Sequence, residues 1–482
     1  MRPRKHPKQA RVVIPPPIEE ARSSAKAPAS AIGPTVSHAA HPPRAEPDRS
    51  APPRLSVPDR HQLLSAMTID ELLEPDHAAR AVWSYVEGLD LTLLYDRIRA
   101  RGHVAGRPAI DPRLLVALWL YATLSGFTSA RELADLCLRH DAFRWLAGGV
   151  SVNYHTLADF RTDDPAFVEE LLKQSVEVLR QQGLIDLDRI AQDGMRVRAS
   201  AGAASFHRRA TLERLLEEAQ AELQELRQKL AANAAPPASP HGVAAEGPPA
   251  GAPDLSPREA AAMRHAEERV QRVEQALERM PEMEAKLKPG DQKEARVSTT
   301  DPQATVMKMA DGGFRPAYNV EYGTTCAGQV VVGVDVVTVG SDQGQMPPML
   351  DQIENRFEQR PNEVLVDGGF ANLEDIERVQ SGGKCQVFAP VAKPRKDTVD
   401  RHEPKATDSE EVAEWRQRMG TKTAQKIYKE RAATAECVNA QARNRGLRQF
   451  MVRGLEKVKS VATWFAIAQN MARSFALQPQ PG

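Results

Sequence analysis

The chain has 482 residues, and its 64 Lys and Arg are balanced by 64 Asp and Glu. This length exceeds one ordinary hydrophobic core, so two or more domains are expected, and the charge balance excludes a uniformly basic nucleic-acid-binding protein while allowing local basic patches. Four scattered cysteines argue against a disulfide framework or a zinc finger, and the absence of a signal peptide and of a long apolar run predicts a cytoplasmic protein with no membrane partner.

The first segment, residues 1–58, is rich in Pro, Ala, Arg and Ser and has no periodic apolar pattern. Such a composition cannot bury enough apolar surface to offset the entropy of ordering, so the sequence predicts a disordered tail. From Met1 to Arg54 the tail carries ten Lys and Arg against four Asp and Glu. This mild excess either assists non-specific contact with DNA or belongs to a solvated leader.

Residues 60–185 are predicted to form an all-helical domain, because their apolar residues recur at helical spacing. Its helix starts are marked by capping residues at Asp111, at Ser129 with Glu132, at Thr156 and at Asp164. The helix opened by Asp111 ends at Ser125-Gly126, so the next helix follows after a short turn. This order is similar to a helix-turn-helix and predicts that the domain binds DNA.

A change of pattern follows this domain. Residues 190–197 predict a short strand that ends near Asp193-Gly194. Two stretches with heptad spacing come next, and their apolar residues are Leu212, Leu216, Ala219, Leu223, Leu226 and Leu230, then Met263, Ala266, Val270, Val273, Leu277 and Met280. A Pro/Ala/Gly-rich link joins them, so residues 205–297 are predicted to be an antiparallel helical hairpin inserted in a β domain.

The β domain, residues 186–475, resumes after the hairpin. The sequence predicts strands at 317–322, 330–339, 363–367 and 386–389, a helix at about 347–357, and helical sequence from about 423 to 475. With the strand at 190–197 first, the order β, β, β, α, β, α, β, α is that of an RNase H-like domain. The predicted fold class is a multidomain α+β or α/β protein, with an all-helical N-terminal domain and an RNase H-like mixed sheet interrupted by a helical hairpin.

Three separated acids stand out in this order of elements. In an RNase H-like sheet the first and fourth strands are neighbours and a later helix packs across them, so Asp193, Asp367 and Glu436 are expected to converge on one edge. Carboxylates bind Mg²⁺ or Mn²⁺, and two such ions roughly 3.5–4 Å apart stabilise the attacking and leaving oxygens of a phosphodiester displacement. We therefore interpret the three acids as catalytic ligands of two metal ions. Asp-Gly is also a common turn dipeptide, so each aspartate alone has a turn interpretation.

The predicted C-terminal helices are locally basic. From Lys422 to Lys459 there are ten Lys and Arg and three Asp and Glu, in a protein that is neutral overall. Such an excess beside a catalytic acid favours contact with a phosphate backbone. The alternative is a solvated basic face of a helix.

These motifs resemble the DDE transposases of bacterial insertion sequences, from about Leu72 to Phe475. Gln192-Asp193-Gly194 and Val366-Asp367-Gly368-Gly369-Phe370 are similar to the family's two aspartate segments, and Thr300-Asp301-Pro302 and Tyr318-Asn319-Val320 to two further elements. The family's C-terminal signature is a Tyr, an Arg three positions later, the catalytic Glu and a Lys seven beyond it. Here the signature falls on Tyr428, Arg431, Glu436 and Arg443.

This signature departs from the family pattern at two points. Four residues rather than three separate Arg431 from Glu436, which leaves the nearby Glu430 as an alternative third acid. Arg443 replaces the usual Lys, and this change keeps the charge and adds a phosphate-binding fork.

The resemblance implies a transposase that cleaves the ends of an insertion sequence and joins them to target DNA with two Mg²⁺ or Mn²⁺ ions. It implies DNA contacts by Tyr428, Arg431 and Arg443, terminal inverted repeats and target DNA as partners, a homodimer or higher multimer on DNA, and a place in the bacterial cytoplasm near the nucleoid. The alternatives are an RNase H-like nuclease without strand transfer and a non-catalytic, transposon-derived DNA-binding protein.

Overall fold

The computed structural model describes residues 52–61, 63–64, 67–102, 107–234, 256–394 and 400–478. Residues 1–51 of the predicted tail and residues 235–255 of the predicted hairpin link lie outside them. Within the described part, the chain already pairs before the predicted tail boundary at residue 58: strand β1, Leu55–Ser56, is parallel to β4, Ala109–Ile110. A second short pair joins β2, Leu63–Leu64, to β3, Met67–Thr68.

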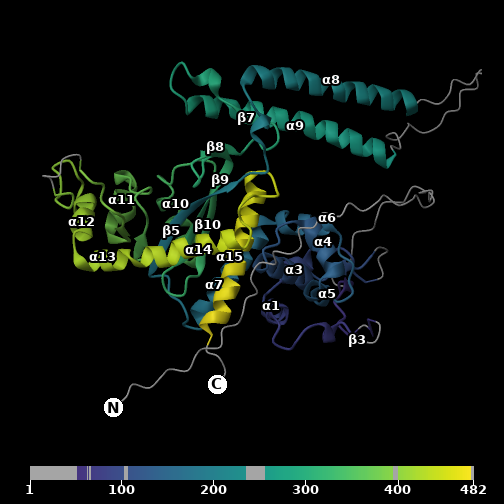
Figure 1. Ribbon diagram of the computed structural model, residues 1–482, viewed down its shortest axis with the longest axis horizontal. Coiled ribbons are helices and arrows are strands. Elements are labelled where there is room, and N and C mark those ends of the chain that lie inside the picture. Colours follow the sequence, from purple (N-terminus) through teal and green to yellow (C-terminus); the bar gives the residue numbers. More distant parts are fainter. Residues whose placement is uncertain are drawn as a thin grey trace, which may run out of the picture.

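A helical region follows these short strands (Figure 1). Its helices are α1 Ala78–Glu87, α2 Thr92–Asp96, α3 Pro112–Leu124, α4 Ala130–Arg139, α5 Asp141–Ala147, α6 Tyr154–Thr162 and α7 Pro165–Gln181. Three predicted starts are confirmed, because the side chains of Asp111, Ser129 and Asp164 accept hydrogen bonds from backbone N–H groups of the first turn. The start predicted at Thr156 is wrong, since Asn153 accepts from the Thr156 N–H and caps α6 three residues earlier.

The centre of this region is α3, which is buried along almost its whole length. Its Trp119 indole donates to the Leu157 carbonyl at 2.9 Å. The C-terminal helix α15, Leu455–Leu477, packs against α3, α6 and α7, and its Trp464 indole donates to the Arg161 carbonyl at 3.2 Å. The helical region and the last helix of the chain therefore share one hydrophobic core.

A mixed sheet forms the centre of the molecule (Figure 1). Its strands are β5 Arg189–Arg198, β8 Thr305–Lys308, β9 Phe314–Thr325, β10 Val331–Val337, β11 Glu363–Leu365 and β12 Gln386–Phe388. Their order is β10-β9-β5-β11-β12, with β8 paired to β9. The pairs β10/β9 and β9/β5 are antiparallel, while β5, β11 and β12 run parallel. The first predicted strand thus lies beside the fourth, and the RNase H-like fold class is confirmed.

Separate apolar cores cover the faces of this sheet. One contains side chains of α10, Met346–Phe357, α11, Leu373–Gln380, and α12, Glu410–Met419. The other contains side chains of α14, Cys437–Asn444, and of α15. Asn470 of α15 fastens this second layer to the sheet, because its side chain exchanges two hydrogen bonds with the Val331 backbone, at 2.7 and 2.8 Å.

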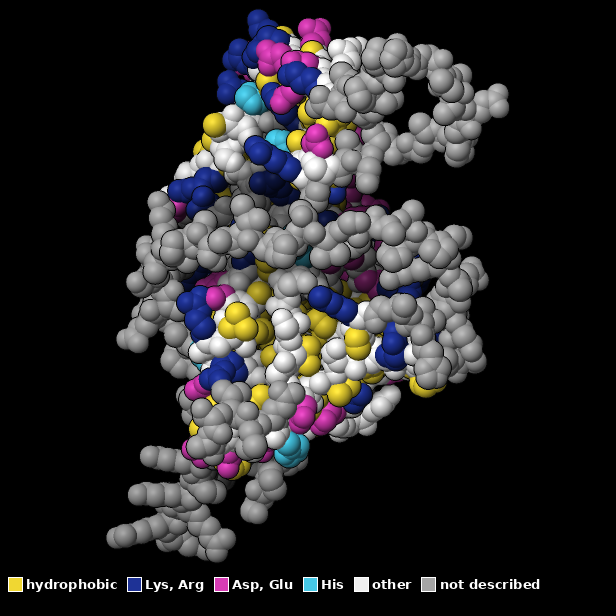
Figure 2. Space-filling model, turned by 90° about the vertical axis from the view of Figure 1, so that its right-hand side faces the viewer, with side chains coloured by type: hydrophobic (Ala, Val, Ile, Leu, Met, Phe, Trp, Pro, Cys, Tyr) yellow, Lys and Arg dark blue, Asp and Glu magenta, His cyan; other side chains and the backbone are white. Residues whose placement is uncertain are grey.

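An antiparallel helical hairpin interrupts the sheet domain, as predicted. Helices α8, Arg209–Ala234, and α9, Pro257–Ala285, extend away from the sheet (Figure 1), and a short pair of strands, β6 Phe206–His207 and β7 Val297–Ser298, closes their base. The heptad positions form the buried contact between the helices. At this upper end of the molecule Figure 2 shows basic and acidic side chains mixed, and pairs such as Arg227–Glu267 at 3.0 Å account for the mixture.

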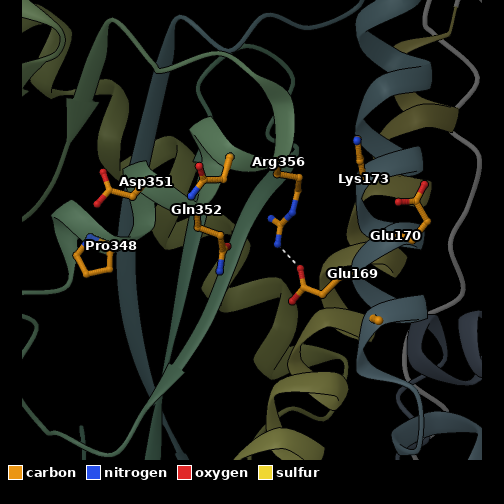
Figure 3. Close-up of a pocket in the computed structure, with 9 residues that line it drawn as sticks. Glu169, Glu170, Lys173, Pro348, Asp351, Gln352 and Arg356 are labelled. Carbon is orange, nitrogen blue, oxygen red and sulfur yellow. Dashed lines mark hydrogen bonds and ion pairs between the residues drawn. The ribbon is translucent and has the colours of Figure 1, made fainter.

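A surface groove of about 730 Å³ separates α7 from α10 (Figure 3). An ion pair crosses it, from Glu169 of α7 to Arg356 of α10. The Arg356 guanidinium also donates to the Val332 carbonyl of the sheet at 2.6 Å. This arginine therefore ties the helical region to the sheet through one largely buried side chain.

Several predicted boundaries were wrong. Strand β5 does not end at Asp193-Gly194 but continues to Arg198, because β9 pairs with it along its whole length. The predicted continuous helix through Glu436 is divided into α13, Lys422–Tyr428, a π-helix, Ala432–Glu436, and α14. No residue range was predicted for β8, α11 or α12; α12 lies in a charged segment, where Ser409 caps it and Trp415 is buried.

Candidate active site

Asp193 lies in the middle of β5, opposite Tyr322 of β9. Its Oδ2 accepts a hydrogen bond from Asn439 Nδ2 of α14 at 3.0 Å, and its Oδ1 lies 4.0 Å from an Arg431 guanidinium nitrogen. Burial raises the pKa of Asp193 to about 6, against the opposing effect of Arg431 and with a further contribution from the charge of Asp367. The turn interpretation of Asp193 is thereby excluded, and the residue is a partly buried acid in a central strand.

Asp367 follows the end of β11. Strand β11 is parallel to β5, and Leu365 is in register with Ala191. Asp367 and Asp193 each lie two residues beyond this pair, so the two aspartates are level with each other. Its Oδ1 accepts from the Gly369 N–H at 2.7 Å, which fixes the carboxylate at the start of the loop. The two predicted aspartates therefore come together at one edge of the sheet.

A third aspartate, Asp342, faces the same place from the segment between β10 and α10. A Cβ atom built on Gly369 would lie 2.9 Å from Asp367 Oδ1 and 3.2 Å from Asp342 Oδ2, so both carboxylates converge there. A Cβ on Gly194 would lie 2.8 Å from Asp342 Oδ1 and 2.6 Å from Glu321 Oε1. Gly194 is thus required by the close approach of carboxylates and not by a turn.

Below Asp342 lies a buried polar layer of β9. Asn319 donates through Nδ2 to Asp342 Oδ1 at 2.7 Å and to Glu321 Oε1 at 2.8 Å. Burial raises the pKa of Glu321 well above its usual range, and the charge of Asp342 acts in the same direction. Burial and the neighbouring Asp342 thus both disfavour the ionised form of Glu321, which shares the Asn319 amide with Asp342.

Glu436 ends the π-helix and is held by Arg431, whose guanidinium donates to Glu436 Oε1 at 2.6 Å. The Glu436 side chain is 54% exposed. In a π-helix each backbone hydrogen bond spans one residue more than in an α-helix, so a π-helix accommodates one inserted residue. Such single-turn insertions are frequent at functional sites. The extra residue between Arg431 and Glu436 falls inside this π-helix, so both side chains still meet at the site.

The other predicted DNA-contacting residues divide between two places. Tyr428 lies next to the acids, with the Arg431 guanidinium 6.0 Å from its ring centre, and burial raises the pKa of its hydroxyl. Arg443 instead lines a neighbouring cavity that begins at Gly194. Arg431 therefore links Tyr428, Asp193 and Glu436, whereas Arg443 extends the site in another direction.

Two family models match the chain. The model described as "Transposase domain (DUF772)" matches residues 67–163 of the helical region, and the model described as "Transposase DDE domain" matches residues 383–475, which include Tyr428, Arg431, Glu436 and Arg443. Both matches support an insertion-sequence DDE transposase. Asp193 and Asp367 of this transposase lie outside both matched ranges, so their place in the site depends on the geometry above. Searches of curated proteins and of solved structures gave no match.

Glu430 of the transposase, the alternative third acid, lies elsewhere. Its Oε2 is 2.8 Å from an Arg189 guanidinium nitrogen, and Arg189 also pairs with Glu363. Arg189 is four residues before Asp193 on the same strand, a separation of about 13 Å at the usual rise of a strand. These contacts favour Glu436 over Glu430 as the acid of the site.

The donor set of the transposase fits a hard divalent cation at the aspartates. Mg²⁺ usually takes one or two carboxylates together with water and substrate phosphate, and Asp193 and Asp367 supply two oxygen ligands whose mutual repulsion a cation would relieve. Glu436 is paired with Arg431 instead. Among the described residues no group of three His, Cys, Asp or Glu side chains is close enough to hold a metal ion.

Within the same residues, no helix is long and apolar enough to cross a membrane.

Sequence reasoning missed Asp342, Glu321 and Asn439. Asp342 and Asn439 carry no local signal, because they reach the site only through the packing of distant elements. Glu321 had a signal, since it and Asn319 alternate with the apolar Tyr318, Val320 and Tyr322 along one strand. A charged residue on a strand that is buried on both faces indicates a polar site beneath it.

We expect Asp193→Asn to raise the thermal stability of the transposase in the absence of metal. The pKa of Asp193 is about 6 in the folded protein against an ordinary 3.8, so the folded state binds this proton more tightly than the unfolded chain. The free energy of unfolding therefore decreases as the pH rises through this window, by an amount on the order of 3 kcal/mol. An asparagine side chain does not ionise, so the variant does not lose this free energy of unfolding as the pH rises. Its amide oxygen still accepts the hydrogen bond from Asn439.

Thermal unfolding of the wild type and the Asp193→Asn variant, at pH 5 and pH 8, measures this effect. The variant should have the higher Tm, by a larger margin at pH 8. Equal Tm values at pH 8 would show that the carboxylate is not destabilised by its surroundings.

Proposed function

We propose that this transposase hydrolyses the DNA ends of its insertion sequence and joins the 3′ hydroxyls to target DNA, as a homodimer or larger multimer on DNA. The observation that carries the proposal is the convergence of Asp193 and Asp367 at one sheet edge, with Arg431 connecting them to Glu436. This arrangement places two metal-binding carboxylates beside a guanidinium that suits a phosphate.

In this proposal Asp193 and Asp367 hold divalent ions, Mg²⁺ or Mn²⁺, and Glu436 is the third ligand. When bound, the ions would supply activation of the attacking oxygen and stabilisation of the leaving oxygen. Asn439 orients Asp193 by occupying its Oδ2, which leaves Oδ1 directed toward Arg431. No Ser or Tyr nucleophile is required, so no covalent protein–DNA intermediate is expected.

Arg431 has two roles in the proposal. Without DNA it neutralises Glu436 at 2.6 Å and lies near Asp193. A DNA phosphate offers the guanidinium a bidentate partner, and its arrival would release the Glu436 carboxylate toward the metal ions. Tyr428, whose ring lies beside the same guanidinium, limits its movement.

The helical region is proposed to recognise the terminal inverted repeats. Helices α3 and α4 are joined by a short turn, and α3 is buried, so α4 is the helix of this pair that presents side chains to DNA. In helix-turn-helix proteins the first residues of the second helix contact base edges. Arg131 stands at that position, over the ring of Tyr154 at 4.9 Å.

We expect Arg131→Ala to weaken binding to the element's own end by roughly tenfold to a hundredfold, the usual effect of losing one base contact. Competition binding with end DNA against random duplex, on the full chain, measures the change. Arg378→Ala, which removes an exposed arginine of α11, serves as the control. An equal loss for both DNA molecules would assign Arg131 to phosphate contact and not to sequence recognition.

The decisive experiment for the function is to incubate the full chain with its own element's end DNA, a target plasmid and Mg²⁺, and to sequence the products. Cut ends joined to the plasmid support a transposase with strand transfer. Cut ends alone would support the nuclease alternative. Binding without cleavage would support the non-catalytic DNA-binding alternative.

A further inference from the structure

A cavity of about 350 Å³ begins at Gly194, the residue after Asp193 of the candidate active site. Gly194, Met195, Arg196 and Arg198 of β5 form one wall, the Met309–Arg315 hairpin turn a second, and Arg443, Leu447 and Arg448 the third. Five arginines thus face this cavity, Arg196, Arg198, Arg315, Arg443 and Arg448, against a single acid, Asp311. Such an excess of positive charge attracts anionic groups.

The edge of β5 connects the acids to this cavity. On that edge β11 pairs only with residues Arg189 to Ala191, and the next contact is at Arg198, which forms a parallel bridge with Gln449. In the described part of the chain, no strand covers the edge of β5 between these two points. Helix α14 and the π-helix contact β5, and the strand leads from Asp193 directly to the residues that line the cavity.

Three of the five arginines keep their charge available. The Arg315 guanidinium pairs with Asp311 at 2.7 Å, and Arg196 donates to the Gly340 carbonyl at 2.6 Å. Arg198, Arg443 and Arg448 are exposed, and within the described residues no carboxylate forms an ion pair with them. Arg198 is joined to residues 448–450 only through backbone hydrogen bonds, so its side chain is not needed for that pairing.

We propose that this cavity binds backbone phosphates of the DNA strand that is held at the acids, a few nucleotides from the phosphate that reacts. The inference depends on the proposed function, and it names a binding site that the catalytic acids do not include. Arg196 and Arg198 are three and five residues from Asp193, so these two arginines of the cavity lie about 10–17 Å along the strand. At a rise of about 3.4 Å per base pair, this distance corresponds to roughly three to five base pairs.

The test is the salt dependence of DNA binding by the full chain without metal. Arg198→Gln/Arg448→Gln removes two phosphate contacts, so the slope of log K against log salt concentration should become shallower by about two, with an unchanged Tm. Arg214→Gln/Arg227→Gln removes two arginines of α8 and is the matched control. The probe is a 30-base-pair duplex of random sequence, measured by fluorescence anisotropy.

A second measurement locates the contact. Neutral methylphosphonates are placed singly along end DNA, and those about three to five base pairs from the cleavage point should weaken binding by the wild type but not by the double variant. A double variant with the wild-type salt slope and the wild-type interference pattern would overturn the proposal while leaving the function intact. A wild type that neither binds nor cuts DNA would overturn both.

Discussion

Asp193→Ala and Asp367→Ala are each expected to lower cleavage of end DNA by about a thousandfold or more, which corresponds to at least ~4 kcal/mol of transition-state stabilisation. Each substitution removes one of the two carboxylates that converge at the sheet edge. Binding of end DNA should stay nearly unchanged, because in the proposed function these acids hold metal ions and do not contact bases. Alanine is preferred to asparagine here, since an amide oxygen still ligates a cation weakly.

Cleavage of labelled end DNA, with binding measured on the same DNA without metal, separates the two effects. Asp351→Ala is the matched control, because Asp351 is a half-exposed acid of α10 that pairs with Arg360 and lies outside the cluster. Cutting at the wild-type rate by either Asp193 or Asp367 variant would remove that residue from the site. A thousandfold loss in the Asp351 variant would point to damage of the fold.

Glu436→Gln should abolish cleavage while DNA binding is retained, and Glu430→Gln should change activity only modestly. On a regular α-helix, Glu430 and Glu436 would lie about 120° apart around the helix axis. That argument fails here, because a π-helix separates them. The contacts decide instead: Glu436 shares Arg431 with Asp193, whereas Glu430 pairs with Arg189 at the other end of the same strand segment.

Both variants are measured in the same cleavage assay, with their Tm as a check on folding. Glu430→Gln removes one of two carboxylate partners of Arg189 and is expected to lower stability slightly, because such half-exposed pairs contribute about 1 kcal/mol or less. A dead Glu430 variant beside an active Glu436 variant would transfer the third acid to Glu430.

The neighbourhood of Asp193 and Asp367 could be predicted because it follows from the order of strands. Adjacent parallel strands run side by side in one direction, and the order of elements made β5 and β11 adjacent. The strand end expected at Asp193 could not be corrected from sequence, because Asp-Gly has the same local appearance in a turn and beside a packed carboxylate. Only the position of Asp342 and Glu321 explains that glycine.

The π-helix explains the irregular spacing between Arg431 and Glu436 in the sequence. Its extra residue could be counted, but the backbone hydrogen bonds that absorb it depend on the contacts of Thr434 and Ala435 with the sheet layer beneath, where both are buried. Helix α12 was missed for a related reason: its charged composition hides the few apolar residues, such as Trp415, that pack on the sheet.

The sharing of one core by α15 and the helical region has a consequence for synthesis of the protein. Chains are made from the N-terminus, and early segments ordinarily fold before later ones exist. Here the apolar faces of α3 and α7 are covered by residues made long after α7 itself, between Leu455 and Leu477. A chain that stops before Leu455 therefore leaves those faces exposed to water, where they promote aggregation and proteolysis. We therefore expect a prematurely terminated chain to aggregate or be degraded rather than to persist as a folded helical fragment.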